Sequence, residues 1–597
     1  MPKRTREKKR SDTVRNLTVY LKRYTMESIL APLFKLLEVV FDLLVPIVVA
    51  KIINIGVAGN DSGYIWHGFM LLILMAAVGL ACSITAQYFA AKASVGFATQ
   101  LRQAMFDHIQ RFSYTELDTL GTDTLITRLT DDVNQVQNGV NMGLRLLLRS
   151  PFVVFGAMIL AFTIDVKCAL VFAVAIPVLF AVVFAIMLVS IPLFKKVQSG
   201  LDRVTGMTRE NLTGVRVIRA FCREKHSVDE FEESNRELTR LNEFVGRISA
   251  LLNPVTYVLI NIAAVVLINK AAVQVNIGGI AQGDVVALYN YMLQIIVELI
   301  KLASLIITLN KALACADRVA SVLAVEPSMS YPESSVVVKD SADADAVRFD
   351  NVSFTYKNAG APSLTDISFS AKRGETVGVI GGTGSGKSSL INLIPRFYDA
   401  SSGCVSIDGI DVREYTREAL CGKIGVVPQR AVLFKGSIRD NLKWGNENAD
   451  DAALWDALTA AQAREVVEGK NGGLDFELEQ NGRNLSGGQK QRLAIARALV
   501  KKPEVLILDD SSSALDFATD AALRRAIHAL SGSMTTFIVS QRIACIRQAD
   551  RILVLDNGRL AGNGTHDELM QCCELYREIF FSQFPEERAK YEKGGED

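Results

Sequence analysis

Residues 376–389 read TVGVIGGTGSGKSS, and this stretch decides the fold of the second half of the chain. Thr376 to Ile380 predict a strand, and the residues from Ser388 onward predict a helix that follows a glycine-rich loop. In such a strand-loop-helix unit, the backbone N–H groups of the loop and the amino terminus of the helix converge on phosphate groups. The stretch therefore predicts an α/β P-loop nucleotide-binding domain.

The P-loop assigns a chemical task to several side chains. Lys387 is expected to reach the β- and γ-phosphates of ATP, and the Ser388 hydroxyl is expected to ligate Mg²⁺. Asp509 follows the apolar strand Val505 to Leu508, where a carboxylate usually holds the magnesium. The ATP-binding residues expected in the loop itself are Gly381, Gly382, Thr383, Gly384, Ser385, Gly386, Lys387, Ser388 and Ser389.

A second motif, Leu485-Ser486-Gly487-Gly488-Gln489, stands directly before a predicted helix over Lys490 to Leu499. Its Ser and Gly backbone groups would present donors at a positive helix end. Together with the P-loop and the Val505–Asp509 strand, this motif makes the chain similar to the ATP-binding-cassette (ABC) family.

This resemblance covers nearly the whole chain and implies an exporter-type half-transporter. It implies that Tyr356 stacks on adenine, that Gln429 senses the γ-phosphate and ligates magnesium, and that Asp516, in Ser513-Ala514-Leu515-Asp516, crosses between subunits. The family also implies that two cassettes pair head to tail. Each ATP would then lie between one P-loop and the signature motif Leu485–Gln489 of the other chain.

The first half of the chain has the composition of a membrane domain. The chain has 597 residues, 49% hydrophobic content and positive mean hydropathy, which is too apolar for one soluble domain. Each apolar stretch approaches or exceeds the ~20 residues that cross a bilayer. Six spans are predicted, at residues 28–53, 64–91, 139–164, 168–194, 247–273 and 284–312.

The connections between these spans predict the orientation. The segments 92–138 and 195–246 are long, polar and helix-patterned, so the helices should extend far beyond the membrane. Lys and Arg crowd these two connections and the amino terminus, which places them in the cytoplasm. The expected localisation is a bacterial plasma membrane, with multiple passes and a cytoplasmic amino terminus and nucleotide-binding domain.

The predicted domain order follows from these patterns. Within the amino terminus, Arg15 to Tyr24 predict a basic helix at the membrane surface. The domains are a basic cytoplasmic segment with this helix (1–27), the transmembrane domain (28–320), a linker (321–345), the nucleotide-binding domain (346–585) and a charged tail (586–597). The stretches Ser113–Asp118 and Gly214–Glu230 resemble the family's coupling segments, which dock on the cassettes.

Several ionisable residues lie inside the predicted spans, where they are costly unless they face protein, water or each other. Lys35, Glu38 and Asp42 share one helical face, and Asn290, Gln294, Glu298 and Lys301 form a polar stripe on the last span. Two interpretations stay open. Lys35–Glu38 and Glu298–Lys301 are local neutralising pairs, or Glu38, Asp42, Arg149, Gln294 and Glu298 line a water-filled substrate cavity.

Two positions depart from the ABC pattern. Asp510 stands where the family has a catalytic glutamate, and Gln541 stands where it has a histidine. Asp510 is shorter by one methylene, and Gln541 cannot carry a proton or a charge as histidine can. Drift would explain either change alone, and an aspartate sometimes serves as a base. Both changes beside an intact P-loop and signature resemble the degenerate-site subunit of bacterial heterodimeric multidrug exporters.

The predicted function is ATP-driven export of small amphiphilic molecules, with ATP and Mg²⁺ as cofactors and a second, different half-transporter as partner. A soluble cassette ATPase is excluded by the apolar spans, whereas a slow homodimer, an importer and an ATP-gated regulator stay open. No basic stripe indicates nucleic acid. The nine cysteines show no spacing typical of zinc sites or of a disulfide framework.

Overall fold

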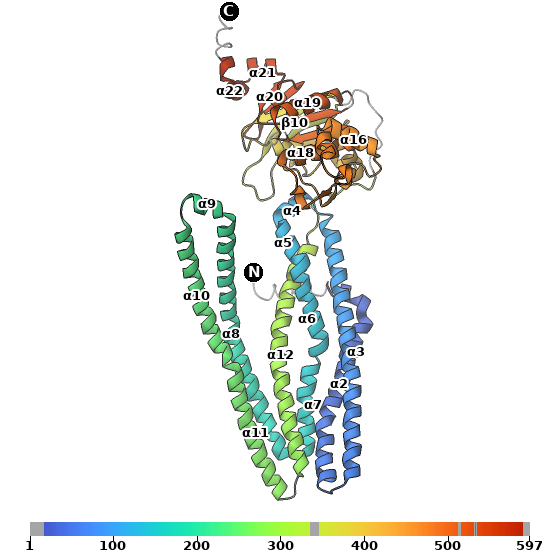
Figure 1. Cartoon of the computed structure of the whole chain (residues 1–597), viewed down its shortest axis with the longest axis vertical. Coiled ribbons are helices and arrows are strands. Elements are labelled where there is room, and N and C mark those ends of the chain that lie inside the picture. Colours follow the sequence, from blue (N-terminus) through green and yellow to red (C-terminus); the bar gives the residue numbers. More distant parts are fainter. Residues whose placement is uncertain (1–16, 335–344, 512–514, 531, 533, 589–597) are drawn as a thin grey trace, which may run out of the picture. The chain divides into compact units, whose positions relative to one another are not determined.

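The computed structural model describes residues 17–334, 345–511, 515–530, 532 and 534–588. The chain forms two units (Figure 1). The first consists of Met1–Gln110 and Asp123–Val325, and the second of Arg111–Thr122 and Glu326–Asp597. A short piece of the first long connection thus belongs to the unit that carries the P-loop.

The first unit is entirely helical in its described residues. Its helices are η1 (Thr18–Tyr24), α2 (Thr25–Lys51), η2 (Ile52–Val57), α3 (Ser62–Ile109), α5 (Thr122–Thr127), η3 (Arg128–Asp132), α6 (Val133–Leu146), α7 (Arg149–Ile164), α8 (Val166–Thr213), α9 (Val215–Ala220), α10 (Glu224–Ala250), α11 (Leu252–Asn276) and α12 (Gln282–Leu323). With 48 residues each, α3 and α8 are about 72 Å long, more than twice the ~30 Å hydrocarbon core of a bilayer.

Five helical segments in the described residues are long and apolar enough to cross a membrane: Ser62–Ile109, Thr122–Ile164, Val166–Thr213, Glu224–Asn276 and Gln282–Leu323. Each contains one of the predicted spans from the second to the sixth. The first predicted span forms α2, but it falls outside this set. Its middle carries Lys35, Glu38 and Asp42, which lower its apolar content.

The segment predicted as a membrane-surface helix is helical in its described residues. Thr18–Tyr24 forms a 3₁₀ helix rather than an α-helix, and Arg15 lies outside the described residues. Leu17 is buried, whereas Lys22 and Arg23 are exposed. The separation of apolar and basic sides is therefore present, and the location of this helix at a membrane surface stays a prediction.

An ion pair joins α12 to η3. Arg318 donates to the Asp132 carboxylate through Nε, at 2.7 Å from Oδ2, and also through a second guanidinium nitrogen. The Asp132 side chain is buried. Two parallel bonds between a fork and a carboxylate fix orientation as well as distance. This contact therefore fixes α12 against η3.

The second unit is an α/β domain. Its strands are β1 (Val347–Phe354), β2 (Leu364–Ala371), β3 (Thr376–Gly381), β4 (Ser402–Ile407), β5 (Ile410–Asp411), β6 (Ile424–Val427), β7 (Gly436–Ser437), β8 (Glu477–Leu478), β9 (Val505–Asp509), β10 (Thr535–Val539), β11 (Arg551–Asp556) and β12 (Arg559–Gly564). Its helices are α4 (Tyr114–Leu120), α13 (Lys387–Leu393), η4 (Val412–Glu414), α14 (Arg417–Lys423), α15 (Ile438–Lys443), α16 (Asp451–Ala460), α17 (Arg464–Glu468), η5 (Gly473–Asp475), η6 (Gln480–Gly482), α18 (Gly487–Val500), α19 (Phe517–Leu530), α20 (Ile543–Ile546), α21 (His566–Cys572) and α22 (Glu574–Gln583).

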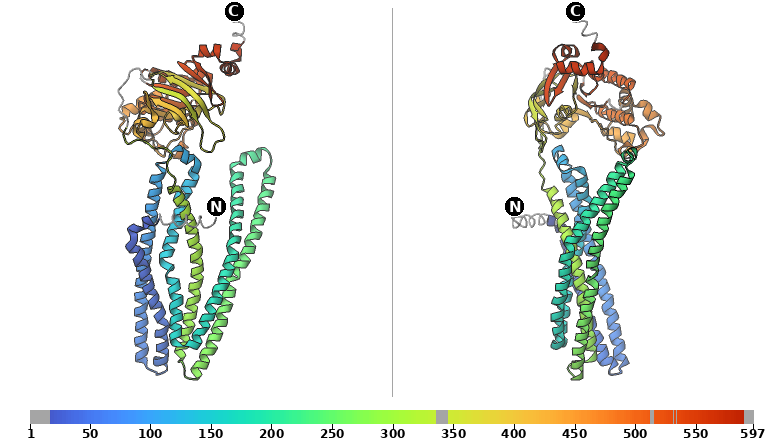
Figure 2. Two further views of the ribbon diagram at one scale, coloured as in Figure 1. Left: turned by 180° about the vertical axis from the view of Figure 1, so that it is seen from behind. Right: turned by 90° about the vertical axis from the view of Figure 1, so that its left-hand side faces the viewer.

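The described strands form a large mixed sheet, a four-stranded antiparallel sheet and a two-stranded sheet made by β7 and β8 (Figure 2). The large sheet has the order β12-β11-β3-β10-β9-β6, in which only β12 runs antiparallel to its neighbour. The buried Val, Ile and Leu residues of β3, β9 and β10 are typical of parallel strands covered on both faces. The sheet therefore brings the carboxyl ends of β3, β10, β9 and β6 to one edge.

Helix α4 packs on the nucleotide-binding domain within the second unit. The Tyr114 ring lies 4.6 Å from the Phe397 ring, centroid to centroid, and the Tyr398 hydroxyl donates to Asp118 at 2.6 Å. The predicted docking of Ser113–Asp118 on the cassette is thus confirmed. The corresponding docking of Gly214–Glu230 stays a prediction, since this segment belongs to the other unit.

Candidate functional site

The P-loop, Asp509, Asp510 and Gln541 meet because they follow neighbouring parallel strands. Strand β10 lies between β3 and β9, and backbone hydrogen bonds at its carboxyl end connect it to both neighbouring strands. The Asp510 N–H donates to Val539 O at 3.0 Å, and the Ser540 N–H donates to Val379 O at 3.1 Å. In parallel sheets, ligands bind at this carboxyl edge.

The P-loop has the backbone of a phosphate cradle. Gly384 and Gly386 have φ values of 82° and 99°, in the left-handed region that favours glycine. A Cβ on Gly386 would lie 2.7 Å from Ser363 O. The Lys387 ammonium donates to Gly381 O at 3.0 Å and to Gly382 O at 2.7 Å, so it points back into the loop.

The residues present fit ATP and magnesium. The cavity that Lys387 and Ser388 line measures about 400 Å³, and the Ser385 hydroxyl is buried without a hydrogen-bond partner among the described residues. The Ser388 hydroxyl lies 3.4 Å from Asp509 Oδ1. Burial raises the pKa of the Asp509 carboxyl and lowers the pKa of the Lys387 ammonium. Both charged forms would gain from the counter-charges of a metal and a phosphate.

The expected magnesium ligands combine a hydroxyl, an amide and a carboxylate. Such a set suits a metal that keeps several waters and binds phosphate oxygens. No cluster of three or more His, Cys, Asp or Glu able to hold a metal occurs among the residues that the structure describes. Ser388, Gln429 and Asp509 would be the protein ligands of a magnesium ion that also binds the nucleotide phosphates.

Asp510 occupies a strained backbone position next to the predicted magnesium ligand. Its φ of 44° lies in the left-handed region, which Asp tolerates better than most residues. The Gln429 amide group, through Nε2, lies 3.4 Å from Asp510 Oδ2. The structure therefore places both predicted residues together at the carboxyl edge.

Gln541 is held by a residue that sequence analysis missed. Gln583, at the end of α22, donates through Nε2 to Gln541 O at 2.7 Å and accepts from the Ile543 N–H through Oε1 at 2.8 Å. The Gln541 side chain itself is exposed. A glutamine 42 residues away thus positions the backbone of the loop that carries Gln541.

We expect Gln583→Ala to loosen this loop. Each lost hydrogen bond is worth ~1 kcal/mol, so the Ile543 amide should exchange its hydrogen roughly fivefold faster or more. Hydrogen exchange followed by mass spectrometry measures this. Gln571→Ala, an exposed glutamine on α21, is the matched control and should leave the exchange unchanged. Equal protection of Ile543 in both variants would contradict the assigned role.

The signature motif forms the amino terminus of α18. The Ser486 hydroxyl accepts from the Gln489 N–H at 3.3 Å, and the Gln489 side chain accepts from the Ser486 N–H at 3.0 Å. This reciprocal capping leaves Ser486 and Gly487 exposed, while Leu485 is buried beneath them. The motif is therefore presented at a helix end, as the sequence predicted.

The remaining predicted residues have local roles. The Tyr356 hydroxyl lies 3.1 Å from Ser389 Oγ, which directs the tyrosine toward the P-loop helix. Asp516 caps α19 by accepting from the Thr519 N–H at 2.9 Å. Ser513 and Ala514 lie outside the described residues.

The turn between β11 and β12 also lines the nucleotide cavity, which sequence analysis missed. Asn557 and Gly558 form this turn, and the Gly558 N–H donates to Ser385 O at 3.2 Å. Asn-Gly is a strong hairpin signal in sequence. The signal predicts a turn, but it does not indicate that β11 lies beside β3.

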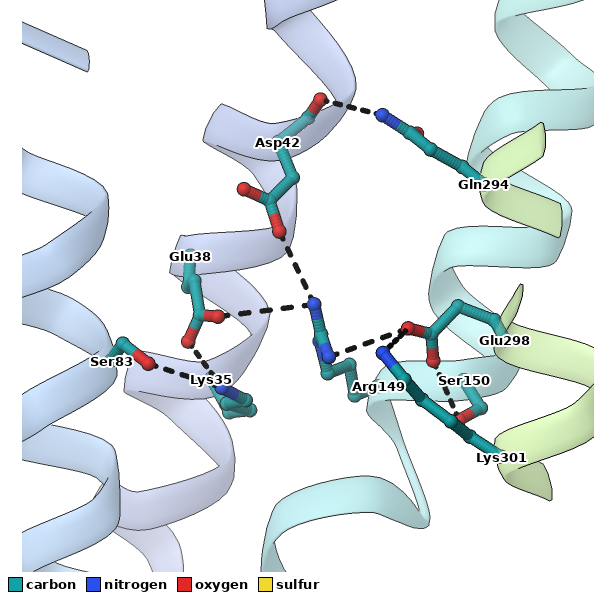
Figure 3. Close-up of polar contacts among 9 residues, drawn as sticks. All are labelled: Lys35, Glu38, Asp42, Ser83, Arg149, Ser150, Gln294, Glu298 and Lys301. Carbon is teal, nitrogen blue, oxygen red and sulfur yellow. Dashed lines mark hydrogen bonds and ion pairs between the residues drawn. The ribbon is translucent and has the colours of Figure 1, made fainter. Parts of the chain in front are cut away.

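In the membrane unit, Arg149 lies at the centre of a charge cluster made by α2, α7 and α12 (Figure 3). Its guanidinium lies 3.3 Å from Asp42, 3.9 Å from Glu38 and 3.4 Å from Glu298. On either side, Lys35 pairs with Glu38 at 2.6 Å and Lys301 pairs with Glu298 at 2.9 Å. Both predicted local pairs thus form, and Arg149 links them.

Hydrogen bonds complete this cluster. Ser150 donates to Glu298 at 2.9 Å, Gln294 donates to the backbone oxygen of Asp42 at 3.3 Å, and Lys35 donates to Ser83 of α3 at 3.3 Å (Figure 3). Three cations face three anions, so the cluster is neutral. The Asp42 side chain is 48% exposed, whereas the Glu298 side chain is 5% exposed. Asp42 is therefore the most exposed carboxylate of the cluster.

We expect Arg149→Met to destabilise the membrane unit by about 3 kcal/mol, because buried carboxylates lose their common partner. A thermal unfolding curve in detergent measures the loss. Adding Asp42→Asn restores neutrality, so the double variant should recover most of the stability. A single variant as stable as the unchanged chain would show that Arg149 is not the link of this cluster.

Comparisons with known proteins agree with this architecture. The family model described as ABC transporter transmembrane region matches residues 28–299, and the model described as ABC transporter matches residues 364–513. An uncharacterised ABC transporter ATP-binding protein of Mycobacterium tuberculosis is 36% identical over 554 residues, covering 92% of this chain and 95% of the relative. A Bacillus subtilis ATP-binding/permease protein, YgaD, whose name refers to multidrug export, is 32% identical over 501 residues, covering 83% and 85% of the two chains.

The fold also matches a solved structure. A bacterial Atm1-family ABC exporter with ATP bound superposes with a TM-score of 0.76 at 23% identity, covering 94% of this chain and 98% of that one. The relatives span both halves of the chain, with the helical unit first and the P-loop unit second. The chain belongs to the ABC transporter family and is a membrane ATPase with an exporter fold, in which ATP hydrolysis is coupled to transport.

Proposed function

We propose that this chain is the degenerate-site half of a heterodimeric exporter of small amphiphilic molecules. The observation that carries the proposal is the pair Asp510 and Gln541 at an otherwise intact nucleotide site. An aspartate carboxylate falls roughly 1 Å short of the position that a glutamate would reach, and a misplacement of this size can cost on the order of 100-fold in rate. ATP binds at this site and is hydrolysed slowly.

The exposed signature supports the second claim of the proposal, that this chain completes the ATP site of its partner. Ser486 to Gln489 keep the helix-capping geometry that presents N–H donors, although the chain's own catalytic positions have changed. A site that uses this signature belongs to another chain, whose P-loop faces it. The signature Leu485–Gln489 therefore completes a competent site on a different half-transporter, with Asp516 at the junction.

The membrane unit supports six spans, with α2 as the first. Its charges Lys35, Glu38 and Asp42 are paired within the protein, which removes most of the cost of burying them in a membrane. The protein lies in a bacterial plasma membrane. Both long connections, the amino terminus and the nucleotide-binding domain are on its cytoplasmic side.

The mechanism is alternating access. Closure of two cassettes around ATP moves the cytoplasmic helices through α4 and the Gly214–Glu230 segment, and re-exposes the cavity to the outside. Lys387 and the loop N–H groups orient the phosphates, and a magnesium ion held by Ser388, Gln429 and Asp509 would neutralise part of their charge. Asp42 faces the substrate, and Glu38, Arg149, Gln294 and Glu298 position it from behind; the exposed Asp42 carboxylate favours cationic amphiphiles. The multidrug-export name of YgaD is consistent with this class.

The proposal is tested by ATPase assays of this chain alone and of this chain co-expressed with a half-transporter encoded beside it. We expect near-zero activity alone, a large rise on pairing, and its loss when the partner's catalytic glutamate is replaced. Substantial activity alone, abolished by Asp510→Asn, would instead establish a homodimer in which aspartate is the base. A nucleotide-gated conductance without concentrative transport would establish a regulator or channel.

A further inference from the structure

A groove of about 770 Å³ runs between α8 and α11 on the membrane unit. The two helices run side by side in both Figure 1 and Figure 2. Its walls are apolar along most of their length. Leu170, Val174 and Val178 line it from α8 at helical spacing, and Val266 is one of the apolar residues that line it from α11. The polar lining residues gather at one end of the groove: Lys167, Asn269, Lys270 and Gln274.

The length of the groove matches one leaflet. On α8 the apolar lining runs from Leu170 to Leu179, about 14 Å, and on α11 the whole lining runs from Leu259 to Gln274, about 22 Å. Half of a ~30 Å hydrocarbon core is ~15 Å. The apolar part therefore accommodates one extended acyl chain, with the lysines at the depth of its headgroup.

The polar end carries a net positive charge. Neither Lys167 nor Lys270 forms an ion pair within residues 17–334, and both side chains are exposed. The Asp165 carboxylate lies nearby in sequence, where it accepts from the Cys168 N–H at 2.7 Å and caps α8, so two cations stand against one anion. Two ammonium groups beside the Asn269 amide form a site for a phosphate at the membrane surface.

We propose that this groove binds an anionic phospholipid, with its phosphate at Lys167 and Lys270 and an acyl chain along Val174 and Val266. The orientation proposed above makes this the outer leaflet. The site is separate from the nucleotide site and from the Arg149 cluster, so it does not depend on the degenerate-site proposal.

Native mass spectrometry of the assembled transporter tests it. The complex is delipidated and titrated with phosphatidylglycerol or phosphatidylcholine. The unchanged transporter should retain phosphatidylglycerol preferentially. Each surface lysine contributes about fivefold to binding an anionic lipid, so Lys167→Gln/Lys270→Gln should weaken the retention of this lipid roughly 25-fold.

Two further variants make the result decisive. Lys51→Gln is the control. Lys51 ends α2 close to Asn54, and Asn54 donates to Asp284 at the start of α12, so Lys51 lies at the same end of the unit as the two groove lysines. Removing its charge should leave lipid retention unchanged. Val266→Trp fills the groove, leaves both lysines, and should displace the lipid. Equal retention by the double variant, equal retention of both lipids, or displacement by inorganic phosphate alone would overturn the proposal. Exclusion of lipid by a partner helix seated in the groove, seen by cross-linking at Val266, would also overturn it.

Discussion

Asp510→Glu together with Gln541→His is expected to raise ATP hydrolysis at this chain's own site about 100-fold. The added methylene extends the carboxylate from a backbone that the Val539 bond already fixes at the sheet edge. The histidine adds a group that can carry a proton toward the γ-phosphate. The rate is measured in the assembled pair after the partner's catalytic glutamate has been replaced, so that only this site can turn over.

Single restorations are the controls for this experiment. We expect Asp510→Glu to recover most of the rate and Gln541→His alone to recover little, because the carboxylate acts on the attacking water. A nucleotide-binding assay should show similar ATP affinity in all variants, since Lys387 and Ser388 are unchanged. An unchanged hydrolysis rate in the double variant would show that these two positions do not limit catalysis.

Gly487→Asp is expected to abolish the ATPase activity of the pair, with a loss on the order of 100-fold or more. No atom outside its own helix backbone and chain neighbours lies within 4 Å of the Cβ that this substitution adds, so the side chain fits. A carboxylate at the amino terminus of α18 suits the helix dipole and should not destabilise the fold. It would nevertheless repel the phosphates of a nucleotide that the partner chain brings to this helix end.

Gly487→Asn is the matched control, because it has nearly the same size and no charge. It should retain far more activity than Gly487→Asp. Thermal unfolding should be the same for both, and nucleotide occupancy of the chain's own P-loop should not change. If Gly487→Asp kept full activity, the signature would not contribute to the hydrolytic site.

Continuous motifs made much of the nucleotide site predictable. The P-loop, the Val505–Asp509 strand and the signature each combine a local backbone shape with its chemistry, so their residues are visible in a short window. Gly558 and Gln583 were missed for the opposite reason. Their contacts with Ser385 and Gln541 arise from the position of β11 beside β3 and of α22 beside α20, which no local pattern encodes.

The membrane unit shows the same division. Of the six spans predicted from apolar runs, five lie in helical segments that are long and apolar enough to cross a membrane. The remaining span, α2, is not among these segments because its charged residues lower its apolar content. The i, i+3 pairs Lys35–Glu38 and Glu298–Lys301 were visible in the sequence. The central place of Arg149 was not, because its partners lie on α2 and α12, 107 or more residues away.

The two ion pairs of α12 have a consequence for movement. Glu298 is tied to Arg149, and Arg318 is tied to Asp132, so the helix is fastened at two points about 30 Å apart. A cylinder held in this way cannot roll about its axis without breaking one fastening. Rearrangement should instead tilt α12 together with α6 and α7 as one lever. For a rigid helix of the length of α12, 42 residues or about 63 Å, a tilt of about 5° carries the far end through roughly 5 Å.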